Sequence, residues 1–172
     1  MKTLVIHPND ITTNMLRVVY ADIPHTLINY DTSASGLNKS IKEHDRIIML
    51  GHGSPYGLYG YNKFVIDMWN VQFLRDKELV CVWCYADEFV KKYKLKAICT
   101  GMIISEWGEA EYLGILPKTS DDIDISNTLF SEAIKQSIQA ENPKEVYNEI
   151  YNGLDNPIID FNKPNFYDYR LI

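Results

Sequence analysis

A histidine and a cysteine each follow a short apolar segment of the chain. His52 comes soon after the segment 46–50, and Cys84 comes directly after the segment 79–83. Short apolar runs bounded by turn or polar residues are typical of strands buried in a parallel sheet. Binding and catalytic sites of open α/β sheets form outside the carboxyl ends of such strands. A thiol needs a base to become a nucleophile, and histidine is the usual base. The sequence therefore predicts a nucleophilic Cys84 paired with His52.

The elements that would position these two residues alternate along the chain. Strands are predicted at 3–7, 25–30, 46–50, 79–83 and 97–100, with helices between them and a hairpin at 57–66. The segment after the third strand carries aromatic residues on both sides of a Gly/Asn turn, which is typical of a hairpin. Strands that alternate with helices indicate an α/β fold in which helices cover both faces of a mostly parallel sheet. We therefore expect a three-layer sandwich.

The second half of the chain is predicted to be mainly helical. Helices are expected at 106–113, 126–140 and 142–151, and the tail from 156 to 172 is expected to be extended or irregular. A chain of 172 residues is most simply one domain, with a real hydrophobic core. We therefore predict a single domain over 1–172, with the helices and tail from about residue 120 packed on it.

Composition narrows the class of protein. The net charge of −6 argues against nucleic acid as the main partner, because phosphate binding favours a basic surface. The first apolar run is too short for a signal-peptide core, and no later run approaches the length of a membrane span. Three cysteines in such a chain favour reduced thiols over a disulfide framework. We expect a cytoplasmic protein with no membrane partner.

The order of these motifs resembles that of the caspase-like cysteine peptidases of clan CD. The resemblance covers residues 3 to about 113 and is carried by M-L-G-H-G-S-P-Y-G-L-Y-G at 49–60 and V-C-V-W-C-Y-A-D at 80–87. It implies that His52 is the catalytic histidine and that Cys84 is the nucleophile. It also implies an oxyanion hole made by the backbone N–H groups of Gly53 and Cys84. A peptide or protein would be the substrate, an acyl-enzyme would form on the cysteine, and neither cofactor nor metal would be needed.

Local chemistry agrees with this assignment, with two departures. A glycine after the histidine lets a backbone N–H approach a substrate carbonyl. A helix that begins just after Cys84 is expected to lower the pKa of the thiol through its dipole. However, Val82 is apolar where several members of the family have a polar specificity residue, and the bulky Tyr85 follows the nucleophile. These departures motivate an alternative, a catalytically inactive caspase-like interaction domain.

Four carboxylates are predicted to lie in loops at the same edge of the sheet. They are Asp10, Asp87, Glu106 and Glu109. They are candidates for holding a cation of the substrate, and each could instead be a helix cap or a surface residue. Charge complementarity then predicts cleavage after a basic or neutral residue rather than an acidic one.

The other histidines and cysteines have simpler interpretations. Cys81 and Cys84 form a C-x-x-C, but residues three apart on a strand point to opposite faces, which argues against a zinc or thioredoxin-like site. Cys99 is predicted to lie in the core, and His7 to be a hydrogen-bonded structural residue. Gly-His-Gly-Ser also occurs in cobalt and iron chelatases, typically after the first strand. Here it follows the third strand, which makes a chelatase-like protein the weaker interpretation.

Overall fold

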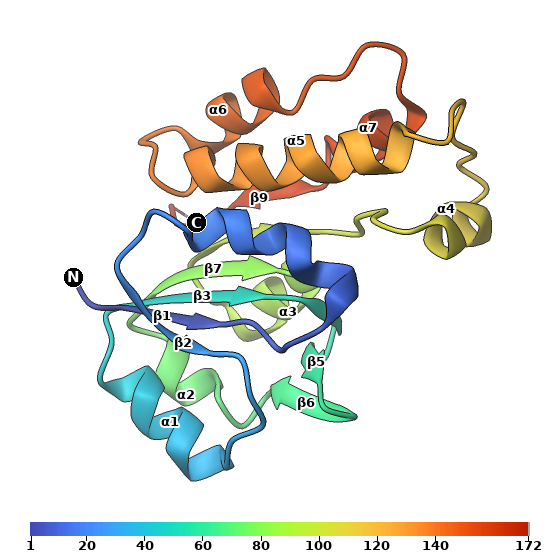
Figure 1. The fold of residues 1–172 in the computed structure, drawn as a ribbon. Helices are drawn as coiled ribbons and strands as arrows, with labels where there is room; N and C mark the ends of the chain where they lie inside the picture. The colour runs from blue at the N-terminus through green and yellow to red at the C-terminus, as the bar shows by residue number, and fades with distance from the viewer. Residues whose placement is uncertain (172) are drawn as a thin grey trace.

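A six-stranded sheet forms the centre of the computed structural model, which describes residues 1–171 (Figure 1). Its strands are, in spatial order, β2 (His25–Ile28), β1 (Thr3–Ile6), β3 (Arg46–Leu50), β7 (Glu78–Val82), β8 (Ala97–Thr100) and β9 (Phe166–Asp168). The first five strands are parallel, and β9 runs antiparallel to β8. The inner strands are buried, except for Glu78 at the start of β7, and are rich in Val, Ile and Leu, as expected of strands covered on both faces. The predicted α/β fold with a mostly parallel sheet is confirmed.

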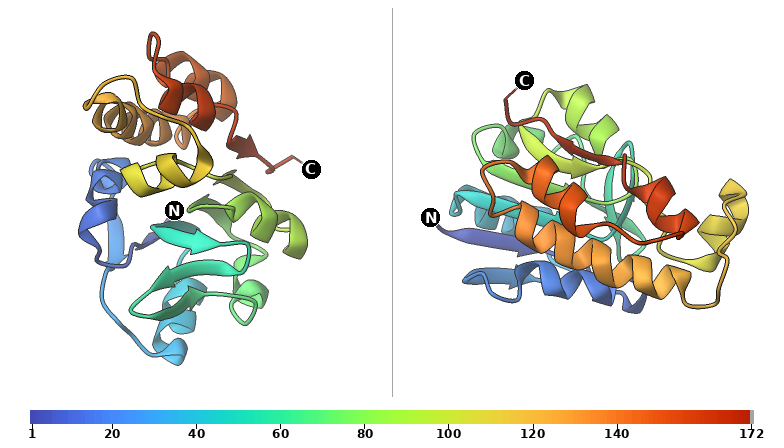
Figure 2. Two further views of the ribbon diagram at one scale, coloured as in Figure 1. Left: turned by 90° about the vertical axis from the view of Figure 1, so that its right-hand side faces the viewer. Right: turned by 90° about the horizontal axis from the view of Figure 1, so that it is seen from above.

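Helices cover both faces of this sheet (Figures 1 and 2). One face packs against α1 (Ala34–Lys42), α2 (Val71–Leu74) and α3 (Ala86–Tyr93). The other packs against the 3₁₀ helix η1 (Ile11–Tyr20), α5 (Asp122–Ser137), α6 (Pro143–Ile150) and α7 (Pro157–Asn162). Successive residues of β7 enter opposite cores, because side chains alternate along a strand: Cys81 faces the first set of helices, and Val80 and Val82 face the second.

A second, smaller sheet follows β3 and is antiparallel. It consists of β4 (His52–Ser54), β5 (Gly57–Gly60) and β6 (Lys63–Ile66). The predicted hairpin is therefore present, and its turn at Tyr61 and Asn62 has φ of 54° and 59°, the left-handed conformation of a tight hairpin turn. Strand β4 was not predicted. It makes His52 the first residue of a strand and so fixes its backbone.

The C-terminal part differs most from the sequence-based expectation. Helix α5 begins at Asp122, not at residue 126, and the Asp122 carboxylate accepts the backbone N–H groups of Lys118 and Thr119, which holds the turn that leads into the helix. The tail is more regular than predicted. Asn156 caps α7, and Phe166 of β9 is fully buried. Helix α4 (Trp107–Leu113) lies near the predicted position.

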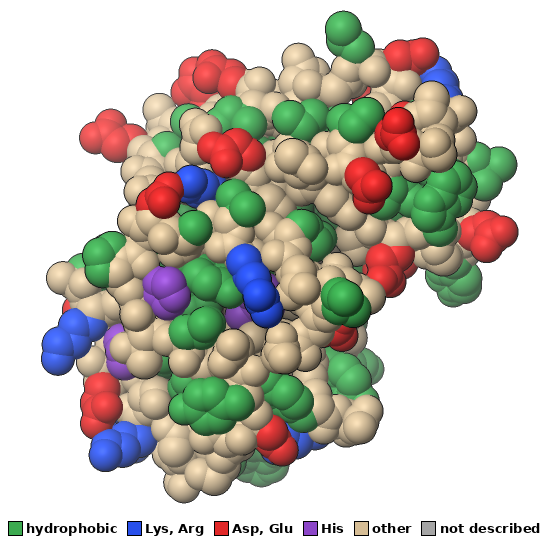
Figure 3. All heavy atoms as spheres, viewed as in Figure 1, with side chains coloured by type: hydrophobic (Ala, Val, Ile, Leu, Met, Phe, Trp, Pro, Cys, Tyr) green, Lys and Arg blue, Asp and Glu red, His purple; other side chains and the backbone are tan. Residues whose placement is uncertain are grey.

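Acidic side chains outnumber basic ones in the sequence, 23 to 17. On the face shown in Figure 3, acidic side chains are spread over the helical layer at the top, whereas basic side chains are scattered, consistent with the net charge of −6. Within residues 1–171, none of the helices combines the length and the apolar character that crossing a membrane requires.

Candidate active site

The structure brings His52 and Cys84 to the same edge of the sheet. Strands β3 and β7 are parallel neighbours, with Leu50 opposite Val82, and each functional residue lies two positions beyond this last pair. The Gly51 N–H donates to the Val82 carbonyl at 3.0 Å, which extends the pairing beyond the strand ends. Both side chains line one small cavity of about 30 Å³, called the nucleophile hollow below. The rest of its lining is Thr13, Met15, Leu16, Gly51, Val82, Trp83, Thr100, Ile103, Ser105 and Phe130.

The thiol of Cys84 is half-buried and donates a hydrogen bond to the Ile103 carbonyl at 3.5 Å. Burial, with a smaller contribution from the negative charges of Glu109 and Glu106, raises its pKa to about 11. The expected lowering of this pKa by a helix dipole is therefore wrong. Helix α3 is only eight residues long and carries two acids in its first turn, so the positive end of its dipole is offset and burial dominates.

The imidazole of His52 is held by a hydroxyl. Its Nε2 lies 2.6 Å from Thr12 Oγ1, and that same hydroxyl donates to Asp10 Oδ1 at 2.7 Å. The hydrogen bonds from Thr12 lower the pKa of the Asp10 carboxyl, which therefore only accepts at neutral pH. Because the hydroxyl has one proton and gives it to Asp10, it must accept from Nε2–H. Neutral His52 then carries its lone pair on Nδ1, which leaves Nδ1 to exchange a proton with a thiol.

Asp10 and Thr12, the first two members of this series of hydrogen bonds to His52, lie at the start of η1. Asp10 also caps η1, because its carboxylate accepts the Thr12 N–H at 2.9 Å. From the sequence, Asp10 is expected to be a substrate contact, a helix cap or a surface residue, and the cap is confirmed. Thr12 was missed as a partner of the histidine. An Asp-x-Thr directly after a predicted strand was the available signal, because such residues hydrogen-bond locally at helix starts.

Trp83 sets the position of β4 against β7. Its indole is buried, and Nε1 donates to the Ser54 carbonyl at 3.0 Å. A Cβ placed on Gly53 would lie 2.2 Å from Trp83 Cδ1 and 2.6 Å from the Gly57 carbonyl oxygen. Glycine is therefore required after His52 by close packing on the indole. The role of the Gly53 and Cys84 N–H groups in an oxyanion hole stays a prediction.

The four predicted carboxylates are placed differently from one another. Asp10 lies beside His52, with Oδ2 3.9 Å from Nε2. Glu106 and Glu109 lie close enough to Cys84 to raise the pKa of its thiol. Glu109 Oε2 also accepts the N–H groups of Ser105 and Glu106 at the start of α4. Asp87 is buried and ion-paired with Lys91 at 2.8 Å, and it is not among the residues that line the cavities beside His52.

His7 and the two other cysteines contribute to the structure. His7 is buried between the Tyr20 and Thr13 hydroxyls, each 3.0 Å from a ring nitrogen, as predicted. Burial lowers the pKa of His7 to about 4, so it is neutral near pH 7. Cys81 and Cys99 are buried in the same core cluster, as predicted for Cys99. Within residues 1–171, no group of three or more His, Cys, Asp or Glu side chains could hold a metal ion.

A second cavity lies on the other side of His52. This histidine hollow has a volume of about 280 Å³ and is lined by Pro8, Asn9, Asp10, Thr13, Gly51, His52, Tyr59, Gly60, Tyr61 and Asn62. It shares Thr13, Gly51 and His52 with the nucleophile hollow. The imidazole therefore stands between a small cavity that holds the thiol and a larger one that does not.

No protein-family model matches the chain, and the comparisons with curated proteins and with solved structures find no significant match either. The geometry of His52, Cys84 and their neighbours is therefore the basis for assigning a function.

Proposed function

We propose that this protein is a thiol hydrolase of the cysteine-peptidase type that forms an acyl-enzyme on Cys84. One observation carries the proposal: His52 and Cys84 follow neighbouring parallel strands and line the same hollow. A nucleophile and a base that meet at the carboxyl edge of an α/β sheet are the arrangement that covalent catalysis requires. The substrate would be a peptide or protein.

The chemistry balances with these two groups and water. The Cys84 sulfur, as thiolate, attacks the carbonyl carbon of the scissile amide, and His52 takes up the thiol proton. As the C–N bond breaks, His52 gives that proton to the leaving nitrogen, and a thioester remains on Cys84. Water then attacks the thioester while His52 accepts its proton. The carboxylic acid product leaves and the thiol is restored.

The order of the elements supports a caspase-like assignment of the fold. His52 follows β3, the small sheet β4–β6 and α2 come next, and β7 leads to Cys84. This is the order on which the resemblance to caspase-like peptidases rests. The Asp10–Thr12–His52 hydrogen bonds add support, because an oriented imidazole is part of the same chemistry.

The nucleophile hollow favours a small neutral residue before the scissile bond. Apart from His52 and Cys84, none of its lining residues within the described chain has an ionisable side chain, and Val82, Ile103 and Phe130 make it apolar. Glu106 and Glu109 place negative charge near Cys84, which would repel an acidic residue. Of the basic and neutral residues expected from the sequence, the neutral ones fit this cavity better.

Two observations favour a second candidate, an inactive interaction domain with the same fold. The hollow of about 30 Å³ has room for little more than water, so a substrate side chain could enter only after its walls move. The raised pKa of the Cys84 thiol also leaves little thiolate at neutral pH. An active enzyme would have to generate the thiolate when the substrate binds.

Labelling with an irreversible, thiol-directed peptide inhibitor separates these candidates. We expect the inhibitor to modify Cys84 in preference to Cys81 and Cys99. We also expect the parent protein to hydrolyse fluorogenic peptides. Cys84→Ala and His52→Ala should each abolish this hydrolysis with little change in thermal stability. Peptides that differ only before the scissile bond should be cleaved faster after a neutral residue than after aspartate. A parent protein that is neither labelled nor active favours the interaction domain. Equal activity in the parent and in Cys84→Ala would place the chemistry elsewhere.

A further inference from the structure

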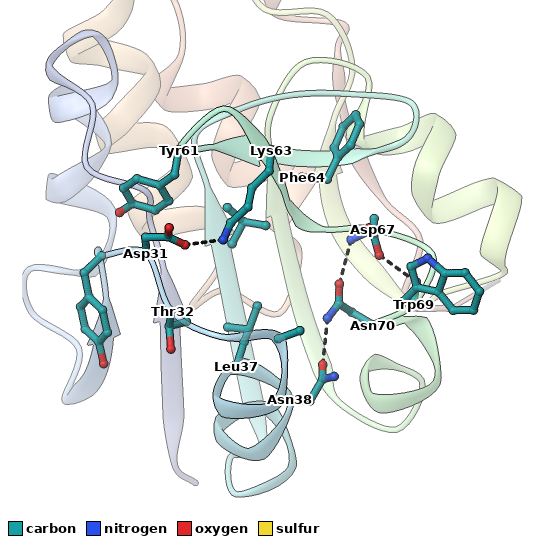
Figure 4. A pocket seen from close by; sticks show the side chains of 13 residues that line it. Asp31, Thr32, Leu37, Asn38, Tyr61, Lys63, Phe64, Asp67, Trp69 and Asn70 are labelled. Atoms are coloured by element: carbon teal, nitrogen blue, oxygen red, sulfur yellow. Dashed lines mark hydrogen bonds and ion pairs between the residues drawn. The ribbon is translucent and has the colours of Figure 1, made fainter.

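The histidine hollow adjoins a third cavity through Tyr61. This aromatic hollow has a volume of about 260 Å³ and lies between the start of α1 and strand β6 (Figure 4). Its lining includes Tyr30, Leu37, Phe64, Val65 and Trp69, and Tyr61 lines both cavities. The nucleophile hollow, the histidine hollow and the aromatic hollow therefore form a row in which each cavity shares lining residues with the next.

Tyr61 is held in place between the last two cavities. It occupies a left-handed position in the β5–β6 turn, and its hydroxyl accepts the Asn9 N–H at 3.1 Å. This contact connects the turn to the loop that carries Asp10. The link between the two cavities thus belongs to the same framework that orients His52.

The walls of the aromatic hollow expose apolar surface that the fold does not bury. The side chains of Tyr30, Phe64 and Trp69 are 58%, 41% and 71% exposed. The charged groups and amides nearby are largely paired with one another: Lys63 pairs with Asp31, and Asn70 bonds both Asn38 and the Asp67 backbone. A cavity with apolar walls and paired polar groups suits an apolar side chain rather than an ion.

The proposed reaction determines which part of the substrate lies in each of these cavities. In acyl transfer the histidine must protonate the leaving nitrogen, so the leaving part of the substrate lies beside His52. The acyl part lies beside Cys84, in or near the nucleophile hollow. The histidine hollow and the aromatic hollow beyond it are then on the leaving-group side.

We propose that the polypeptide segment that follows the scissile bond runs from the histidine hollow past Tyr61 and places a large apolar side chain in the aromatic hollow. This inference rests on the proposed hydrolase function and names its substrate class, a polypeptide recognised on the leaving-group side. Binding far from the reacting bond helps to position that bond, so the enzyme discriminates against substrates with short leaving groups.

The test compares six substrates that are identical up to the scissile bond. One ends in an aminocoumarin leaving group, and the other five continue for five residues. The extension is Gly/Ser only in one peptide, and each of the other four carries one Phe, at the second, third, fourth or fifth position. We expect the best Phe peptide to exceed the Gly/Ser peptide in kcat/KM by roughly tenfold or more, the effect of burying one large apolar side chain.

Variants assign that difference to the aromatic hollow. Trp69→Ala and Phe64→Ala each remove part of the wall of the aromatic hollow, so in each variant the ratio of kcat/KM for the best Phe peptide to that for the Gly/Ser peptide should fall to near one. Tyr112→Ala, which removes a 90% exposed aromatic ring of α4, should retain the preference. Equal hydrolysis of all extended peptides, or a preference that survives both substitutions, would overturn the inference while the hydrolase function stands. Absence of Cys84-dependent hydrolysis of every substrate would overturn the proposed function and this inference together.

Discussion

Cys84 is protonated at neutral pH in the resting protein, because burial and two nearby carboxylates raise the pKa of its thiol to about 11. Thr12 engages Nε2 of His52, and Asp10 Oδ2 lies 3.9 Å from the same nitrogen, so the proton of the neutral imidazole is held on Nε2. A raised thiol pKa keeps the free protein unreactive. Catalysis would then depend on substrate binding to bring the thiol and imidazole into proton transfer.

Alkylation kinetics test the protonation state of Cys84. Without substrate, the rate of its reaction with iodoacetamide should increase about tenfold per pH unit and continue to increase above pH 9, because the thiolate fraction grows until the pKa is reached. An ordinary thiol would level off near its pKa of 9.0. Cys84→Ala provides the background, since Cys81 and Cys99 are buried. A fast plateau below pH 8 would show instead that a thiolate–imidazolium pair exists in the free protein.

Thr12 is a positioning residue, and its hydroxyl can be removed without changing the volume of the side chain. Thr12→Val should reduce kcat by roughly a hundredfold, because the His52 ring loses the acceptor that fixes its tautomer and orientation. Thr12→Ser keeps the hydroxyl and should restore most of the activity. A fall of similar size in both variants would mean that the methyl group of Thr12, through packing, matters more than the hydrogen bond.

At the scale of elements, the small sheet is attached to the main sheet through Trp83. The indole packs on Gly53, and its N–H donates to the Ser54 carbonyl. Trp83, which directly follows β7, therefore fixes strand β4, which begins with His52. Helix α3 contacts β4 and β5 from the same side. The separation of His52 from Cys84 therefore depends on packing between β4 and Trp83 as well as on the register of β3 with β7.

Gly53→Ala tests this attachment. The added methyl group would overlap the indole, so we expect a loss of roughly 1–3 kcal/mol in the free energy of unfolding and a large loss of any peptidase activity. Gly108→Ala in α4 is the matched control, because a Cβ there meets nothing within 4 Å. It should leave stability unchanged or raise it by up to about 1 kcal/mol. Urea unfolding at neutral pH measures both, and equal stability of the two variants would contradict close packing at Gly53.

The sequence predicts the elements around the dyad well because their signals are local. Apolar runs identify β3 and β7, and the Gly/Asn turn identifies the β5–β6 hairpin. What it misses depends on contacts between distant segments. Strand β9 is only three residues long and exists because Phe166 stacks on Tyr147, with ring centroids 4.2 Å apart. The raised pKa of Cys84 likewise depends on burial by distant segments, such as those of Leu16 and Phe130 that line the same hollow, which no local pattern reveals.

At the scale of the whole molecule, Asn162 joins the C-terminal helices to the loop beside Cys84. Its amide is fully buried, accepts the Ile104 N–H at 2.7 Å and donates to the Ile104 carbonyl at 2.9 Å. It also donates to the Tyr151 hydroxyl at 3.0 Å. Ile104 follows the residue whose carbonyl holds the Cys84 thiol. The tail thereby supports one wall of the nucleophile hollow.

Asn162→Ala should destabilise the entire chain in one step. Truncation leaves both backbone groups of Ile104 buried without their partner, a loss of roughly 2–4 kcal/mol. Tryptophan fluorescence reports on the first part of the chain, because all three tryptophans (Trp69, Trp83 and Trp107) precede residue 120. Far-UV circular dichroism is dominated by helix, of which α5, α6 and α7 supply a large part. If 1–172 is a single domain, both signals shift together to lower urea concentration.

Asn152→Ala, at an exposed position, is the control for Asn162→Ala and should change stability by less than about 0.5 kcal/mol. The decisive comparison is between the two signals within Asn162→Ala. If the helical signal were lost at a lower urea concentration than the fluorescence change, the C-terminal helices would unfold by themselves and the single-domain prediction would be wrong. Coincident transitions would mean that the wall beside Cys84 is only as stable as the helices that follow residue 120.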